Sequence, residues 1–303
     1  MIVVVCPGQG SQTPGFLAPW LELDGAAGRL AAFSDAAQVD LVAHGTESDA
    51  DTIRDTRIAQ PLIVAASVLA WEQLTQGGAR PDGVAGHSVG EIAALVAAGV
   101  IDAEAGLALV GVRGRAMADA AALVETGMSA VVGGVEEQVL EAIAANDLTP
   151  ANYNGGGQIV AAGALPGLAA LSEAAPRGAR VIPLQVAGAF HTAFMAPAQA
   201  TLQAAVDGIT NVADPALPLW TNSDGTTLTS GSRALELIVH QVANPVRWDL
   251  CMASFAEQGI TGVIELAPAG ALVGLAKRGL RGVPSVAVKT PEDLAAALEL
   301  LAA

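Results

Sequence analysis

The sequence predicts an α/β protein with a parallel sheet and a small inserted subdomain. The 303-residue chain opens on a continuous apolar run, Ile2–Cys6, which is typical of a parallel strand covered on both faces. Predicted helices and further short strands alternate after it, as in other α/β proteins. Between residues 126 and 188 the predicted order changes to strand, helix, strand, strand, helix, strand, which is the order of a ferredoxin-like unit. We therefore expect a large subdomain at 1–125 and 189–303 and a small one at 126–188.

The elements of the large subdomain follow from apolar runs and helix signals. The predicted helix from Ala59 to Leu74 is hydrophobic around most of its circumference, which indicates that it is buried. Thr290 followed by Pro291 and acidic residues is a capping signal for the last helix. The other predicted elements are a strand at Gly83–Ala85, helices at Ile92–Ala98 and Glu104–Ala121, a helix from Ala193, a helix ending near His240, a strand at Gly262–Leu266, a helix that carries Lys277, and a strand at Ser285–Val288.

The small subdomain is predicted from four short strand-like segments and two helical ones. Its two middle strands flank a glycine-rich turn, Asn154–Gly157, which favours a hairpin. The predicted elements are strands at Met128–Val132, Ala151–Tyr153, Gln158–Ala162 and Arg180–Val186, and helices at Glu136–Asn146 and Leu165–Ala174.

Composition excludes several classes of function. The net charge is −16, from 30 acidic and 14 basic residues, which makes nucleic acid and anionic membrane poor partners. No apolar run approaches the ~20 residues that a membrane helix needs, and the N-terminal segment lacks the basic region of a signal peptide. Cys6 and Cys251 lie in apolar surroundings without metal-ligand spacing, so we expect buried free thiols, no metal and a reducing cytoplasm.

The strongest chemical signal is Gly86–Glu91, which reads G-H-S-V-G-E and matches G-x-S-x-G. It lies between a predicted strand and a predicted helix, the context of a nucleophile elbow. The glycines permit a tight turn that exposes the Ser88 hydroxyl, and the following N–H and helix N-terminus favour developing negative charge. A pattern with three fixed positions also occurs by chance, so a turn without chemistry is the alternative for the motif alone.

His191 is the histidine best placed by sequence to act as the base for Ser88. His87 is inside the elbow, His240 is on a predicted helix, and His44 lies in a polar stretch. His191 follows a glycine-containing turn and precedes a predicted helix, a junction from which it can reach another segment. The alternative is a histidine at a helix N-terminus with no catalytic role.

Three other positions leave two interpretations open. The loop Pro7–Gln12 could cradle a phosphate, but Thr13 departs from the dinucleotide pattern, so presentation of N–H groups near Ser88 is favoured. Arg113, between apolar residues and glycines, is either a surface side chain or a buried anion clamp, and position alone favours the surface. Gln60, at the start of a buried helix, is a weak candidate for the wall of a site.

The chain as a whole resembles the malonyl-CoA:acyl carrier protein transacylases of fatty-acid and polyketide synthesis, in a free-standing actinobacterial form. Seven motifs in the same order are far more specific than any one of them. They are PGQGSQ at Pro7–Gln12, GHSVGE at Gly86–Glu91, VRG at Val112–Gly114, NGGGQIVAAG at Asn154–Gly163, GAFH at Gly188–His191, QVANPVRW at Gln241–Trp248 and GLAKR at Gly274–Arg278.

The resemblance implies a hydrolase-like α/β body with a ferredoxin-like insert, and it assigns catalytic roles. Ser88 is the expected nucleophile and His191 its base. The N–H groups of Gln9 and Val89 are the expected oxyanion hole. The backbone carbonyl of Gln241 is expected to orient His191, so that its side chain matters less than the turn. No carboxylate completes a triad in this family.

The resemblance also implies the substrate. Arg113 is expected to pair with the free carboxylate of malonyl-CoA, which reverses the interpretation from position alone. Phe190, together with Val89, is expected to disfavour a 2-methyl group, and Gln60 and Gln158 complete the candidate substrate-binding set. No cofactor or metal is implied.

The implied partner is a phosphopantetheinylated acyl carrier protein, which is acidic like this chain. The basic cluster Lys277, Arg278 and Arg281 is therefore favoured as the docking patch; the alternative is ordinary cations at a helix C-terminus. We expect a monomer. Two positions depart from the family pattern: Tyr153 replaces an asparagine, and Ala267–Gly270 replaces Gly-Pro-Gly-Lys.

Two other functions use the same features. A serine hydrolase or thioesterase would use water as the acceptor, but it gives Arg113 no role and usually carries an acidic third member. A non-catalytic carrier-binding subunit would not need Ser88, His191 and Arg113 together.

Overall fold

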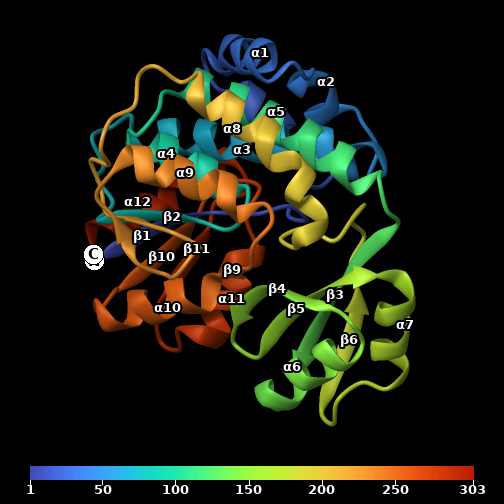
Figure 1. Cartoon of the computed structure of the whole chain (residues 1–303). Helices are drawn as coiled ribbons and strands as arrows, with labels where there is room; N and C mark the ends of the chain where they lie inside the picture. The colour runs from blue at the N-terminus through green and yellow to red at the C-terminus, as the bar shows by residue number, and fades with distance from the viewer.

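The computed structural model describes all 303 residues and contains two sheets with flanking helices (Figure 1). The larger sheet has six strands: β1 (Ile2–Cys6), β2 (Gly83–Gly86), β7 (Leu219–Trp220), β8 (Thr227–Leu228), β10 (Gly262–Glu265) and β11 (Ser285–Ala287). Their order is β11-β10-β1-β2-β7-β8, and all neighbours are parallel except β7 and β8. The predicted parallel sheet is confirmed, with one short antiparallel strand added at its edge.

Helices cover both faces of this sheet, as the continuous apolar run of β1 predicts. Val4 and Cys6 pack into the larger core, whereas Val3 and Val5 pack into a second core on the opposite face. Figure 1 shows the corresponding helix layers above and below the sheet. The first layer includes α3 (Thr56–Thr75), α4 (Gly90–Ala97), α5 (Ala103–Ala121) and α12 (Leu294–Ala302), and the second is α10 (Trp248–Glu257) and α11 (Ala271–Gly279).

The remaining helices lie over the first layer or connect the elements. Contacts join α5 to two of them, α1 and α8. These helices are α1 (Ala26–Ala37), α2 (Leu41–Thr46), α8 (Ala196–Asp207) and α9 (Gly231–Gln241), with the 3₁₀ helices η1 (Ala18–Glu22), η2 (Thr52–Arg54), η3 (Ala193–Met195) and η4 (Pro291–Asp293). None of the helices combines the length and apolar character required to cross a membrane.

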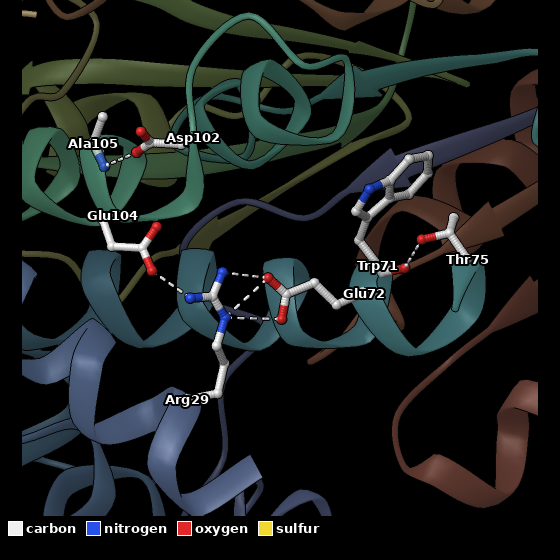
Figure 2. Close-up of polar contacts among 7 residues, drawn as sticks. All are labelled: Arg29, Trp71, Glu72, Thr75, Asp102, Glu104 and Ala105. Carbon is white, nitrogen blue, oxygen red and sulfur yellow. Dashed lines mark hydrogen bonds and ion pairs between the residues drawn. The ribbon is translucent and has the colours of Figure 1, made fainter. Parts of the chain in front are cut away.

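Arg29 joins α1 to two helices of the first layer, α3 and α5 (Figure 2). Its guanidinium donates to both carboxylate oxygens of Glu72 on α3, at 2.6–3.1 Å, and it also contacts Glu104 in the first turn of α5. Asp102 caps α5 by accepting the N–H of Ala105 at 2.8 Å. The ion pairs are partly exposed, so each contributes about 0–1 kcal/mol. They link α1 to α3, which carries Gln60, and to α5, which carries Arg113.

The second sheet lies beside the first, with its own helices α6 (Glu136–Ala145) and α7 (Leu165–Glu173) (Figure 1). Its order is β6-β3-β5-β4-β9, antiparallel apart from the parallel pair β4 and β9. A division of the chain at residues 126 and 188 stays a prediction, and β9 comes from the last third of the chain. The strands are β3 (Thr126–Gly133), β4 (Thr149–Gly155), β5 (Gln158–Ala164), β6 (Ala179–Pro183) and β9 (Val246–Arg247).

Two sequence-predicted boundaries were wrong. The strand predicted to reach Val186 ends at Pro183, although the N–H of Leu184 still donates to the Met128 carbonyl at 2.9 Å. The helix predicted from Ala193 begins as a 3₁₀ turn, and the α-helix starts at Ala196 with Pro197 in its first turn.

Candidate active site

The segment between β2 and α4 forms a sharp turn that places Ser88 at the carboxyl end of the sheet. Ser88 has φ of 54°, in the left-handed region that non-glycine residues rarely adopt. A Cβ atom at Gly86 would lie 2.1 Å from the carbonyl carbon of Gly90, and one at Gly90 would lie 2.2 Å from the Cys6 carbonyl oxygen. Only glycine fits at either position, so the two glycines allow the strained turn that exposes the Ser88 hydroxyl.

Asn222, two residues after the end of β7, holds this turn from the neighbouring strand. Its Oδ1 accepts the N–H of Ser88 at 2.7 Å, and its Nδ2 donates to the Gly86 carbonyl at 2.7 Å. Sequence analysis missed Asn222, because β7 is only two residues long and has no detectable periodicity. Its position at the carboxyl end of a parallel strand is the signal that could have found it.

His191 lies within hydrogen-bond distance of the Ser88 hydroxyl. The Nε2 atom of His191 is 2.7 Å from Ser88 Oγ, and its Nδ1 is 2.9 Å from the Gln241 carbonyl oxygen. Because a carbonyl can only accept, Nδ1 must carry the proton, which leaves the Nε2 lone pair toward the Ser88 hydroxyl. His191 also has a left-handed backbone, with φ of 61°, and its N–H donates to the Val242 carbonyl at 3.1 Å.

Burial keeps the imidazole of His191 neutral. Desolvation by burial, the largest cause, and the positive charge of Arg113 together lower its pKa to about 3. The Gln241 carbonyl, which acts in the opposite direction, does not restore the ordinary value. At neutral pH the ring is therefore unprotonated and able to accept a proton.

Arg113, on α5, is buried beside this pair, with an exposed fraction of 1 %. It donates to Gln60 Oε1 at 2.7 Å and to Gln241 Oε1 at 2.8 Å, and one Nη lies 3.5 Å from Ser88 Oγ. Its Nε has no partner. Burial lowers the pKa of Arg113 to about 10, so the side chain remains charged at neutral pH. The surface position that its sequence context favoured is wrong, because α5 turns this residue toward the sheet.

The Gln241 side chain has more contacts than sequence analysis expected. Besides accepting from Arg113, it donates from Nε2 to the Ser88 carbonyl at 3.1 Å and to Glu91 Oε2 at 2.5 Å. Glu91, the last residue of the elbow motif, also accepts the backbone N–H of Asn222. The expectation that the Gln241 side chain matters less than the turn is therefore incomplete, and the sequence did not single out Glu91.

Two backbone N–H groups near Ser88 are free to donate. The N–H groups of Gln9 and Val89 have no hydrogen-bond partner, and both residues line the same cavity as Ser88. The Gln9 side chain lies 3.4 Å from Thr56 Oγ1, at the start of α3. Both N–H groups are therefore available to donate to an oxyanion, and their role as an oxyanion hole stays a prediction.

A cavity of about 140 Å³ brings most of the candidate residues together. Phe190 lines it and is buried. The wall consists of Gln9, Gln60, His87, Ser88, Val89, Arg113, Met117, Met128, Asn152, Asn154, Val160, Leu184, Val186, Phe190 and His191.

Gln158 does not line this cavity, so its place in the substrate-binding set stays a prediction. Its Oε1 accepts from Asn154 Nδ2 at 2.9 Å, and Asn154 Oδ1 in turn lies 2.8 Å from His87 Nε2. The hairpin between β4 and β5 turns Gln158 toward a second pocket formed by Tyr153 and the glycine-rich turn. Gln158 thus contacts the site through Asn154, which joins the second sheet to the elbow.

The basic cluster is at the C-terminal end of α11. Lys277, Arg278 and Arg281 are exposed, and none of them forms an ion pair. Arg278 adjoins the second sheet, because a Cβ atom built at Gly156 would lie 2.8 Å from its own. The cluster is thus a free cationic surface next to the glycine-rich turn.

Comparisons with known proteins agree over nearly the whole chain. Residues 3–293 match the family model described as "Acyl transferase domain". The chain is 52 % identical over 297 residues to the malonyl CoA-acyl carrier protein transacylase of Mycobacterium tuberculosis (strain ATCC 25618 / H37Rv), covering 97 % of this chain and 98 % of that one. A crystal structure of MCAT from Mycobacterium tuberculosis superposes with a TM-score of 0.95 at 52 % identity over 99 % of both chains.

A solved complex is also similar. The structure of PlMCAT with AntF (holo), described as a type II PKS acyl-carrier protein in complex with its malonyl-transacylase, superposes with a TM-score of 0.90. It is 32 % identical over 98 % of this chain and 99 % of that one.

Proposed function

Since this chain belongs to the acyl transferase family, and within it to the malonyl CoA-acyl carrier protein transacylases, we propose that it transfers the malonyl group of malonyl-CoA to the phosphopantetheine thiol of an acyl carrier protein. The observation that carries this proposal is the buried, charged guanidinium of Arg113 beside the Ser88–His191 pair. Planar guanidinium groups bind carboxylates through paired, charge-assisted hydrogen bonds.

The first half of the reaction forms a malonyl ester on Ser88. His191 Nε2 accepts the hydroxyl proton as Ser88 Oγ attacks the thioester carbonyl carbon. The N–H groups of Gln9 and Val89 donate to the tetrahedral oxyanion, and removal of one such donor typically costs about 3–4 kcal/mol of barrier. The C–S bond then breaks, and the coenzyme A sulfur takes the proton held by His191.

The second half repeats these steps with a different thiol. His191 accepts the proton of the phosphopantetheine thiol, whose sulfur attacks the malonyl ester. The oxyanion forms again between Gln9 and Val89, the C–O bond breaks, and the proton returns to Ser88 Oγ. A thioester is exchanged for a thioester, so the reaction runs near equilibrium.

The Gln241 carbonyl replaces the carboxylate of a Ser-His-Asp triad. It holds Nδ1–H and thereby the tautomer that the base requires. A carbonyl carries no full charge, so the imidazolium that forms during attack is less stabilised than beside aspartate. The short-lived cation is close to Arg113, which favours rapid return of the proton to the leaving sulfur.

The carrier and the cellular setting follow from the same proposal. The similar complex of PlMCAT with a type II PKS acyl-carrier protein supports a carrier as partner, and the free cations of Lys277, Arg278 and Arg281 suit an acidic surface. The chain acts as a cytoplasmic monomer and needs no cofactor or metal.

The experiment compares two acceptors. The protein is incubated with malonyl-CoA and phosphopantetheinylated carrier, and malonyl-carrier and free malonate are quantified by mass spectrometry. We expect malonyl-carrier as the main product, and none with carrier that lacks phosphopantetheine. Free malonate as the main product, independent of carrier, would support a serine hydrolase instead. Absence of any product would support a non-catalytic binding subunit.

A further inference from the structure

A carboxylate, an amide and a guanidinium form a buried chain behind Ser88. Glu91 Oε2 accepts from Gln241 Nε2 at 2.5 Å, and Gln241 Oε1 accepts from Arg113 at 2.8 Å. Glu91 and Gln241 are each 5 % exposed, and Arg113 is 1 % exposed. The three residues come from α4, α9 and α5, so that tertiary packing alone brings them together.

The hydrogen bonds of Glu91 allow only one orientation of the Gln241 amide. Above its pKa of about 7 the ionised Glu91 carboxylate only accepts, and both of its oxygens face N–H donors, from Asn222 and from Gln241. The amide nitrogen of Gln241 must therefore face Glu91, and its oxygen must face Arg113. With the amide turned over, an NH₂ group would point at the guanidinium and an oxygen at the carboxylate.

We propose that Glu91 is a positioning residue, which acts through the Gln241 amide to hold the Arg113 guanidinium ready for the carboxylate of the acyl group. The inference rests on the proposed function, because it assigns Arg113 that carboxylate. The amide spacer is important: a direct Glu–Arg ion pair would occupy and neutralise the guanidinium. Instead, neutral oxygens of Gln60 and Gln241 orient it and leave its Nε without a partner.

The isosteric variant Glu91→Gln tests this directly. The new amide has one oxygen, so it cannot accept from both Asn222 and Gln241, and one donor must face another. We expect kcat/KM for loading of Ser88 with malonyl-CoA to fall about tenfold or more. Loading with acetyl-CoA, which has no carboxylate, should fall by a smaller factor, so that the malonyl-to-acetyl ratio falls.

Glu265→Gln is the matched control. Glu265 is also buried, and its carboxylate accepts the N–H groups of Gly270, Leu272 and Val273 at the start of α11, away from Arg113. This variant shows how far kcat/KM changes when a buried, hydrogen-bonded glutamate outside the site is replaced. The control should leave the malonyl-to-acetyl ratio unchanged.

A double-mutant cycle with Gln241→Met completes the test and provides a second variant if Glu91→Gln does not fold. Gln241→Met alone should lower the malonyl-to-acetyl ratio, and the double variant should lower it no further, because both changes interrupt one chain. An unchanged ratio in Glu91→Gln, or in Gln241→Met alone, overturns the inference, as do effects that add. If wild-type protein does not load malonyl at all, the proposed function has failed instead.

Discussion

Ser88 Oγ lies 2.7 Å from His191 Nε2, although 103 residues separate them in the chain. Both residues have left-handed backbones, with φ of 54° and 61°. Such conformations cost about 1–3 kcal/mol each and persist only where surrounding contacts impose them. Here Asn222 holds the Ser88 turn, and the carbonyls of Gln241 and Val242 hold His191. The scaffold therefore holds a nucleophile and a base within hydrogen-bond distance of each other.

Removal of the guanidinium should change substrate preference. We expect Arg113→Ala to lower kcat/KM for malonyl-CoA by about 10- to 100-fold. This factor corresponds to the loss of a hydrogen bond to a charged group. Activity with acetyl-CoA should fall much less. The measurement is the ratio of the two kcat/KM values. Arg233→Ala, which removes an exposed arginine paired with Glu236, is the control for loss of one charge. An unchanged ratio in Arg113→Ala would contradict the role of Arg113.

Phe190 should limit the size of the acyl group. Its ring lines the catalytic cavity, so Phe190→Ser opens space for a 2-methyl group. One methyl group is worth ~1–3 kcal/mol, so we expect kcat/KM for methylmalonyl-CoA relative to malonyl-CoA to rise about tenfold. Phe194→Ser, an exposed phenylalanine on η3, should leave this ratio unchanged. No gain in Phe190→Ser would show that another residue sets the limit.

Charge reversal at the end of α11 should weaken use of the carrier. We expect Lys277→Glu with Arg278→Glu to raise KM for acyl carrier protein severalfold, and most strongly at low salt, because both chains are acidic. Transfer to free pantetheine should stay the same. Arg80→Glu with Lys289→Glu reverses two exposed cations elsewhere and serves as the control. Equal loss in both double variants would assign the effect to net charge and not to this patch.

Buried groups near Ser88 act on stability in opposite directions as pH changes. The pKa values of His191 and His87 are lowered by burial from 6.5, that of His191 to about 3. The unfolded chain therefore binds more protons below pH 6.5, and these residues lower the free energy of unfolding as pH falls. Burial raises the pKa of Glu91 from 4.5 to about 7, so its contribution increases as pH falls from 7 toward 4.5.

Replacement of Glu91 should make acidification more damaging. We expect the free energy of unfolding of Glu91→Gln, measured by urea denaturation, to fall more steeply than wild type between pH 7 and 5. The charged or titratable groups that face Glu91 are Arg113 on α5 and Cys251 on α10. Three more line a cavity of about 310 Å³ with it: Tyr153 on β4, His240 on α9 and Arg247 on β9. Glu236→Gln, at an exposed position of α9, should follow the wild-type slope. A shallower slope in Glu91→Gln would contradict the raised pKa.

Sequence patterns predicted the parts of the fold that have strong local signals. The apolar run Ile2–Cys6 predicted a doubly covered parallel strand, and the elbow motif predicted the turn at Ser88. The strands β7, β8 and β9 escaped notice because two residues show no periodicity. These short strands matter for the site, because β7 leads to Asn222 beside the elbow and β9 is part of the second sheet.

The sequence predicted the reactive groups of the site but not the side chains that hold them in position. Ordered motifs predicted that Ser88, His191 and Arg113 would meet, and they line one cavity. Glu91 was overlooked because an acid in the first turn of a helix is normally solvated and favoured by the helix dipole alone. The Gln241 side chain was expected to matter less than the turn that carries it. Only the packing of α9 against α4 shows that Glu91 is buried and bonded to a residue 150 positions away. A contact between residues so far apart in the chain cannot be predicted from the local spacing of residue types.

The most direct test of the central claim is peptide mapping by mass spectrometry after brief incubation with malonyl-CoA alone. We expect one malonyl group on the peptide that contains Ser88, none in Ser88→Ala, and loss of the group when phosphopantetheinylated carrier is added. An unmodified Ser88 peptide in a preparation that still transfers malonyl to carrier, or a malonyl group on another residue, would contradict the claim that Ser88 forms the acyl-enzyme.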